Sequence, residues 1–97
     1  MCTYQTFKLA VRGSAKGPAS WIRVTEASVY YDHPVHAIDE HTLNIDLRNP
    51  ERGPSARVAV ELSAQAAYDL AQAILKALES VPPGMLPDGL LMETSRV

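Results

Sequence analysis

The chain has 97 residues, 46% hydrophobic and 21% charged, a composition typical of one folded domain rather than a disordered segment. Nine Lys and Arg residues against eleven Asp and Glu residues give a net charge of −2, so neither nucleic acid nor an anionic membrane surface is an expected partner. The single cysteine, Cys2, excludes an intramolecular disulfide framework and a cysteine-rich zinc module. The sequence has no visible secretory signal and no membrane-length apolar run, and we therefore expect a cytoplasmic protein.

The N-terminal part alternates between apolar and polar residues. This alternation predicts a strand over Thr3–Arg12, with Phe7, Leu9 and Val11 facing the core. Gly, Ser and Pro residues then predict a loop over Gly13–Ser20. Its glycines lack the spacing of a phosphate-binding loop, so the segment is interpreted as a plain connection.

The middle of the chain predicts two further strands around a polar loop. Either a short edge strand or an extended approach over Trp21–Val24 precedes a strand over Glu26–Asp32, which is rich in β-formers. Pro34 interrupts a loop over Asp32–Glu40, and the next strand spans His41–Arg48. The two long strands are expected to be antiparallel neighbours.

The C-terminal part predicts a hairpin followed by a helix. Asn49–Ser55 has the composition of a turn and joins a strand over Ala56–Leu62 to the preceding strand. Arginines flank this turn and could bind an anion, namely Arg48 and Arg52. Ser63 caps a helix that runs to about Ser80. Its polar residues form one narrow stripe: Gln65, Asp69, Gln72, Lys76 and Glu79.

These elements predict an α+β fold, an antiparallel sheet of three to four strands packed by one long C-terminal helix. Residues 1–80 form the single domain, and residues 81–97 form an apolar tail that contains prolines and glycines. The apolar surface of the helix is wider than one sheet contact requires. Either the helix lies in a curved sheet, or part of this surface meets a second subunit in a homodimer or higher homo-oligomer.

All three histidines fall within nine residues, at His33, His36 and His41. Strand alternation places His33 and His41 near each other at one end of the sheet, and His36 at the apex of the loop between them. Imidazole is the commonest transition-metal donor, so the cluster is a candidate site for a divalent metal, with Zn foremost and Fe, Cu or Ni as alternatives. A polar turn also collects His and Asp without any metal, and the spacing is not that of the common zinc sites.

Other residues near the cluster are candidates for supporting roles. Asp39 and Glu40 could orient a histidine ring, complete a metal site, or act as catalytic acid and base. Cys2 could supply a sulfur ligand, although its parity is that of Tyr4 and Thr6 rather than of the inward residues.

Three functions therefore remain open. The first is a metal-binding protein, extending to a metal-dependent lyase, isomerase, cyclase or hydrolase that acts on a small metabolite. The second is a non-enzymatic oligomeric interaction protein that uses the helix and the tail. The third is a metal-free enzyme that relies on acid–base chemistry of His with Asp or Glu.

Four segments carry a resemblance to a known family: Met1–Tyr4 (MCTY), Tyr30–His36 (YYDHPVH), Glu40–Asp46 (EHTLNID) and Gly53–Leu62 (GPSARVAVEL). Together they resemble a family of small actinobacterial proteins of unknown function. The resemblance spans residues 1–80 and implies a bacterial cytoplasmic protein encoded near natural-product pathways. It implies no catalytic residue in this sequence.

Overall fold

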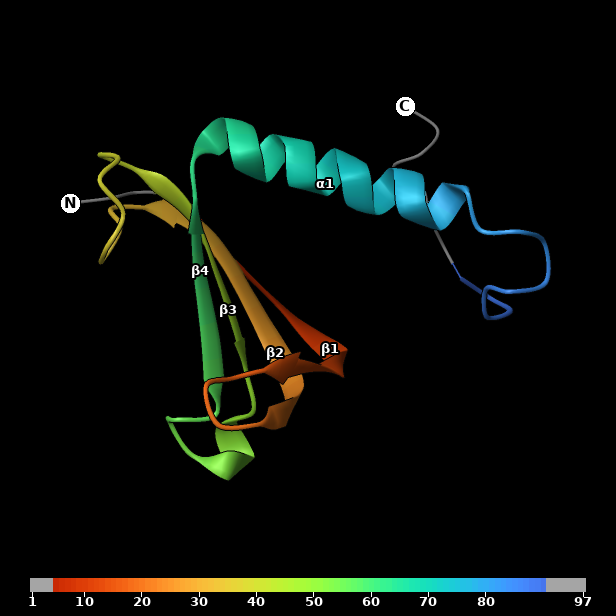
Figure 1. Ribbon diagram of the computed structural model, residues 1–97, viewed down its shortest axis with the longest axis horizontal. Helices are drawn as coiled ribbons and strands as arrows, with labels where there is room; N and C mark the ends of the chain where they lie inside the picture. Colours follow the sequence, from red (N-terminus) through yellow and green to blue (C-terminus); the bar gives the residue numbers. More distant parts are fainter. Residues whose placement is uncertain (1–4, 91–97) are drawn as a thin grey trace. The chain divides into compact units, whose positions relative to one another are not determined.

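The computed structural model describes residues 5–90 and divides the chain into two compact units, residues 1–64 and residues 65–97. The first unit contains a four-stranded antiparallel sheet with the strand order β1-β2-β3-β4. The second unit contains nearly all of helix α1, which spans Ala64–Glu79 (Figure 1). A sheet followed by one C-terminal helix is an α+β fold, as the sequence predicts.

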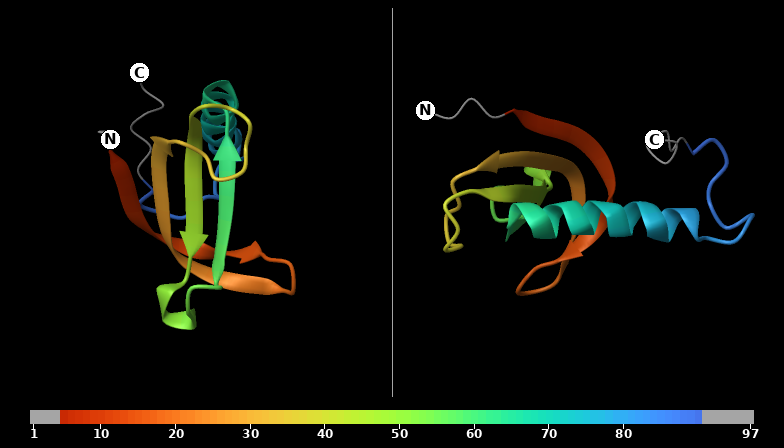
Figure 2. Two further views of the ribbon diagram at one scale, coloured as in Figure 1. Left: turned by 90° about the vertical axis from the view of Figure 1, so that its left-hand side faces the viewer. Right: turned by 90° about the horizontal axis from the view of Figure 1, so that it is seen from above.

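The strands form a meander in which each strand pairs with the next one along the chain (Figure 2). Their bounds are Thr6–Lys16 for β1, Trp21–Asp32 for β2, Thr42–Arg48 for β3 and Arg57–Leu62 for β4. A short 3-10 helix, η1 (Pro50–Arg52), lies in the turn between β3 and β4. The predicted hairpin between the last two strands is confirmed, as is the antiparallel pairing of β2 with β3.

The predictions for residues 13–24 were wrong in two respects. Residues Gly13–Lys16, expected in a loop, continue β1 and pair with Trp21–Val24, which belong to β2 rather than to a separate edge strand. The register shifts between Ala10 and Gly13, as at a β-bulge, and such a bulge bends a hairpin. In Figure 2 the outer part of this hairpin turns across the ends of the other two strands. Backbone pairing has overridden the loop-like composition of this segment.

The two faces of the sheet differ in chemistry. Residues that pair across the strands lie on the same face. The set that we call the apolar face comprises Phe7, Leu9, Ala27, Val29, Tyr31, Leu43, Ile45, Leu47, Val58, Val60 and Leu62. The opposite set, the polar face, includes Glu26, Ser28, Tyr30, Asp32, Thr42, Asn44, Asp46, Arg48, Arg57 and Glu61.

A sheet usually buries its apolar face and exposes its polar face, but several residues of this sheet do the opposite. On the polar face, Thr42 is 1% exposed and Asn44 is 5% exposed, and the Thr42 hydroxyl donates a hydrogen bond of 2.7 Å to the Asn44 side-chain oxygen. On the apolar face, Phe7 is 61% exposed and Leu9 is 50% exposed. Polar residues are thus covered while large apolar side chains of β1 stand in solvent.

Helix α1 matches its predicted extent closely. A hydrogen bond of 3.0 Å joins the Ser80 N–H to the Lys76 carbonyl, and the Ser80 hydroxyl donates to the Ala77 carbonyl at 3.0 Å. No residue of the helix is buried. Within residues 5–90, no helix is long and apolar enough to cross a membrane. Of the predicted tail, residues 91–97 lie outside the described part of the chain.

Candidate functional site

Two of the three histidines form a ring pair at one end of the sheet. Asp32 pairs with Thr42, so His33 follows β2 where His41 precedes β3. The two imidazole rings stack with centroids 4.5 Å apart and an interplanar angle of 29°. The Tyr31 ring also stacks on the His41 ring, with centroids 5.9 Å apart. Strand alternation predicted this juxtaposition.

The loop backbone holds the orientation of His33. Its Nδ1 lies 3.1 Å from the Glu40 carbonyl oxygen, so Nδ1 carries the proton when this hydrogen bond forms. That tautomer leaves the Nε2 lone pair available to a metal or a proton. The His33 N–H in turn donates to the Asp32 carboxylate at 2.6 Å. The ring pair therefore rests on a hydrogen-bonded turn.

The candidate acids, Asp39 and Glu40, lie in the loop just before His41. Glu40 reaches His33 through its backbone carbonyl, and the side chains of both Asp39 and Glu40 are exposed. Cys2 lies outside the described residues.

His36 does not join the ring pair. Its backbone N–H donates to the Glu61 carboxylate at 3.1 and 3.3 Å. Glu61 pairs with Asn44 on the polar face, whereas Tyr31, which stacks on His41, lies on the apolar face. Within residues 5–90, no group of three or more His, Cys, Asp and Glu side chains is placed to hold one metal ion.

Glu61 is the anchor of the 33–41 loop. Its carboxylate accepts the backbone N–H groups of Val35, His36 and Ala37, the last at 2.8 Å. The hydrogen bonds from Ala37 and Val35 favour the ionised form and lower the pKa of the Glu61 carboxyl below its ordinary value of 4.5. The anchored segment and Glu61 line a hollow of about 460 Å³.

Sequence reasoning missed this anchor. Strand alternation puts Glu61 on the polar face of the sheet, where an acid is ordinarily solvated. The residue lies more than twenty positions from the loop that it binds, and no local pattern links the two. Only the pairing of β3 with β4 brings them together.

Two arginines of the β3–β4 hairpin form ion pairs. Arg48 contacts Glu26 at 2.8 Å, and Arg57 contacts Asp46 at 2.7 Å. The Asp46 carboxylate also lies 3.5 Å from the Tyr30 hydroxyl, and burial together with this negative charge raises the pKa of Tyr30 above 10.0. Arg48, a predicted anion ligand, thus already has a carboxylate partner.

Comparison with known proteins gives a family and no activity. No curated protein and no solved structure matches the chain. The model of a family of unknown function, DUF6295, matches residues 1–87. That match includes both strands that flank the histidine pair, Glu61 and helix α1. The chain therefore belongs to the DUF6295 family, a family of unknown function.

Proposed function

We propose that this protein is a non-enzymatic assembly module of the cytoplasm, and that two or more copies associate through the apolar face of the sheet and the apolar surface of helix α1. The observation that carries the proposal is the exposure of large apolar side chains on the sheet, above all Phe7 and Leu9 on the edge strand β1. Exposed apolar surface of this kind typically marks a contact with another protein.

The small core of the chain supports the same conclusion. The buried hydrophobic residues among those described are Val24, Ala27 and Ala56, all of them small. A domain of this length normally buries large aliphatic and aromatic side chains, because apolar burial offsets the conformational entropy lost on folding. The apolar face therefore needs a cover.

Helix α1 has an apolar surface suited to such a role. At 100° per residue, its apolar positions cover an arc of about 220°, and its polar stripe takes the remainder. Leu70, Ile74 and Tyr68 on this helix are all exposed. One contact with a sheet occupies roughly half of such an arc. The rest is free to contact a second helix.

A second copy of the chain is the occupant that we assign to these surfaces. The chain itself carries two apolar surfaces, the apolar face of the sheet and one side of the amphipathic helix, and both include exposed side chains. Two copies thus supply everything needed to cover both, as in a symmetric interface that uses the same patch on each subunit. The small net charge of −2 leaves little repulsion between copies.

The test is the mass of the full-length protein in solution, measured by sedimentation equilibrium from low micromolar to high micromolar concentration. We expect a dimer or a higher oligomer. Leu9→Asp should shift the protein towards the monomer, whereas Ala10→Asp, the next residue on the opposite face of the same strand, should not. Both positions are exposed, and circular dichroism checks that each variant keeps its fold. A wild-type protein that stays monomeric throughout would overturn the proposal, because the helix of the same chain would then be the cover.

A second candidate function is binding of a divalent metal at the His33–His41 pair. The stacked rings and the Glu40 hydrogen bond, which frees Nε2 of His33, favour it. The lone pair of an imidazole nitrogen lies in the plane of its ring, and the two ring planes are only 29° apart, so one ring must rotate out of the stack before both can hold a tetrahedral Zn²⁺. Two protein ligands leave the remaining positions of a bound metal to water. Zn²⁺ held this way would polarise a carbonyl or activate a water in a reaction on a small metabolite.

The metal candidate is tested with Zn²⁺ alone, by calorimetric titration of tag-free protein. His33→Ala and His41→Ala should each remove most of the binding. His36→Ala is the matched control and should leave it unchanged, because the His36 backbone is held on the other face. Binding that survives in both His33→Ala and His41→Ala, or no binding by the wild type, would reject this candidate.

A further inference from the structure

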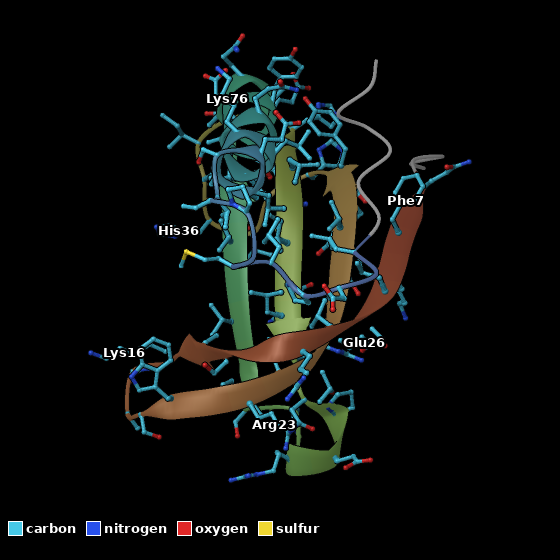
Figure 3. All side chains as sticks on the ribbon, turned by 90° about the vertical axis from the view of Figure 1, so that its right-hand side faces the viewer. Phe7, Lys16, Arg23, Glu26, His36 and Lys76 are labelled. Carbon is cyan, nitrogen blue, oxygen red and sulfur yellow. The ribbon has the colours of Figure 1, made fainter. Side chains whose placement is uncertain are left out.

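A hollow of about 420 Å³ lies between the turn that joins β1 to β2 and the turn that joins β3 to β4. One wall is the β1–β2 turn with the start of β2, including Pro18 and Ile22, and the other is η1 with the start of β4. Figure 3 labels Arg23 on the first hairpin near this end of the sheet. The volume falls within the range of small-molecule sites, which runs from about 300 to 1,000 Å³.

The charge of this hollow is opposite in sign to that of the chain. Three arginines line it, namely Arg23, Arg52 and Arg57, and none of the lining residues is acidic. The whole chain, by contrast, has a net charge of −2. Several guanidinium groups around one hollow create a local positive potential that attracts an anion. The guanidinium fork suits the paired oxygens of a carboxylate or a phosphate.

Two of these arginines have side chains that are not engaged elsewhere. Arg57 directs Nε and Nη2 towards Asp46 at 3.0 and 2.7 Å. Within residues 5–90, the side chains of Arg23 and Arg52 make no hydrogen bond or ion pair. Their donors remain available to a ligand, and the Asp46 contact holds Arg57 in place beside them.

Both walls of the hollow are braced by backbone hydrogen bonds. In the first wall, Gly17 N–H donates to the Ser20 carbonyl at 2.9 Å. In the second wall, Arg52 N–H donates to the Asn49 carbonyl at 3.0 Å, and Asn49 N–H donates to the Ala56 carbonyl at 3.0 Å. Asn49 is buried. A braced site loses little conformational entropy when a ligand enters.

The remaining lining is mostly apolar, with side chains of Pro18, Ala19, Ile22 and Ala56. We infer that this hollow binds a small organic anion, with a carboxylate or phosphate group on Arg23 and Arg52 and an apolar body against Pro18 and Ile22. The inference is independent of the assembly proposed above, because none of the lining residues belongs to the apolar face of the sheet or to helix α1.

The probes are phenyl phosphate, benzoate and inorganic phosphate, each titrated into full-length ¹⁵N-labelled protein and followed by NMR. Saturable shifts of the Gly17, Ala19 and Ala56 amides are expected with phenyl phosphate or benzoate, and weaker binding with inorganic phosphate. Comparison of phenyl phosphate with benzoate decides between a phosphate and a carboxylate head group.

Variants assign the binding to the arginines. Arg23→Ala and Arg52→Ala should each lower the affinity for the tighter-binding organic probe by about tenfold or more, as expected for loss of a charge-assisted hydrogen bond. Arg23→Lys should recover only part of this loss, because an ammonium lacks the fork. Lys8→Ala, which removes one charge from β1 outside the hollow, is the control. Absence of saturable shifts with both organic probes, or affinities unchanged in both arginine variants, would overturn the inference.

Discussion

The carboxylate of Glu61 accepts the backbone N–H of Ala37 at 2.8 Å, although the two residues are 24 positions apart in the chain. The same carboxylate also accepts the N–H groups of Val35 and His36. One side chain of β4 thereby holds the segment that contains His36, apart from the other two histidines. The hydrogen bonds of Glu61 therefore hold the middle of the 33–41 loop, and those of His33 with Asp32 and Glu40 hold its two ends.

Replacement of Glu61 by Gln should release the loop. The amide oxygen of Gln is a weaker acceptor than a carboxylate and cannot receive three N–H groups equally well. We expect faster hydrogen exchange at the amides of Val35, His36 and Ala37 in the variant, with the exchange of β3 amides little changed. Glu51→Gln, an exposed acid in η1, is the control. Equal exchange at these three amides in wild type and Glu61→Gln would show that the loop does not depend on the carboxylate.

The contribution of Glu61 to stability should depend on pH. Backbone hydrogen bonds from Ala37 and Val35 lower its pKa in the folded protein below 4.5. A carboxyl with a depressed folded pKa stabilises the fold above its unfolded pKa, and this contribution is lost as the pH falls through the folded pKa. The difference in unfolding free energy between wild type and Glu61→Gln should therefore be constant near neutral pH and shrink below about 4.5. Denaturant titrations at pH 7, 5, 4 and 3 measure it, and a difference that grows on acidification would contradict the assignment.

The buried Thr42 hydroxyl should contribute to stability. Its hydrogen bond to the Asn44 side-chain oxygen is 2.7 Å long, and the residue is almost completely buried. Thr42→Val preserves the shape and removes the donor, so we expect a loss of about 1–3 kcal/mol in unfolding free energy, because a buried acceptor loses its partner. Thr25→Val, at an exposed threonine of β2, should change stability by less than about 0.5 kcal/mol. Similar small effects for both variants in urea unfolding would count against the hydrogen bond.

The Arg57–Asp46 ion pair should give a modest coupling energy. Arg57 uses both Nε and Nη2 on one carboxylate oxygen, but its side chain is 48% exposed. A double-mutant cycle with Arg57→Ala and Asp46→Asn should give about 0.5–1 kcal/mol at low salt, and less at 1 M salt because of screening. The Arg48–Glu26 pair, joined through Nε alone, is the reference cycle. A coupling that does not respond to salt would argue against an electrostatic origin.

Gly53 should be intolerant of a side chain. Its φ of 96° with ψ of 171° lies in a region that essentially only glycine adopts, and a Cβ added there would meet no atom within 4 Å. The cost of Gly53→Ala is thus one of backbone strain alone, about 1–3 kcal/mol in thermal or denaturant unfolding. Gly17→Ala, at a turn glycine without a positive φ and with only an ordinary contact to the Ser20 carbonyl, is the matched control. A Gly53→Ala variant as stable as Gly17→Ala would refute the strain argument.

Strand alternation and turn composition in the sequence predicted the pairing of β2 with β3 and of β3 with β4, and the position of one histidine pair. Alternation along β3 and β4 assigned Ile45 and Val60 to the same face, and the short turn made the two strands a hairpin. The same alternation, carried one residue past each strand end, brought His33 next to His41. These features are local, because they depend on a side-chain period of two and on one turn.

Tertiary structure alone decided three other features. Gly13–Lys16 became part of β1 because Trp21–Val24 offered a backbone partner, despite a composition typical of a loop. His36 left the histidine cluster because Glu61, distant in sequence, binds the loop backbone. The arginine-lined hollow arises because the bend of one hairpin meets the turn of another. Each of these depends on contacts between distant segments, and no periodicity within a single segment encodes them.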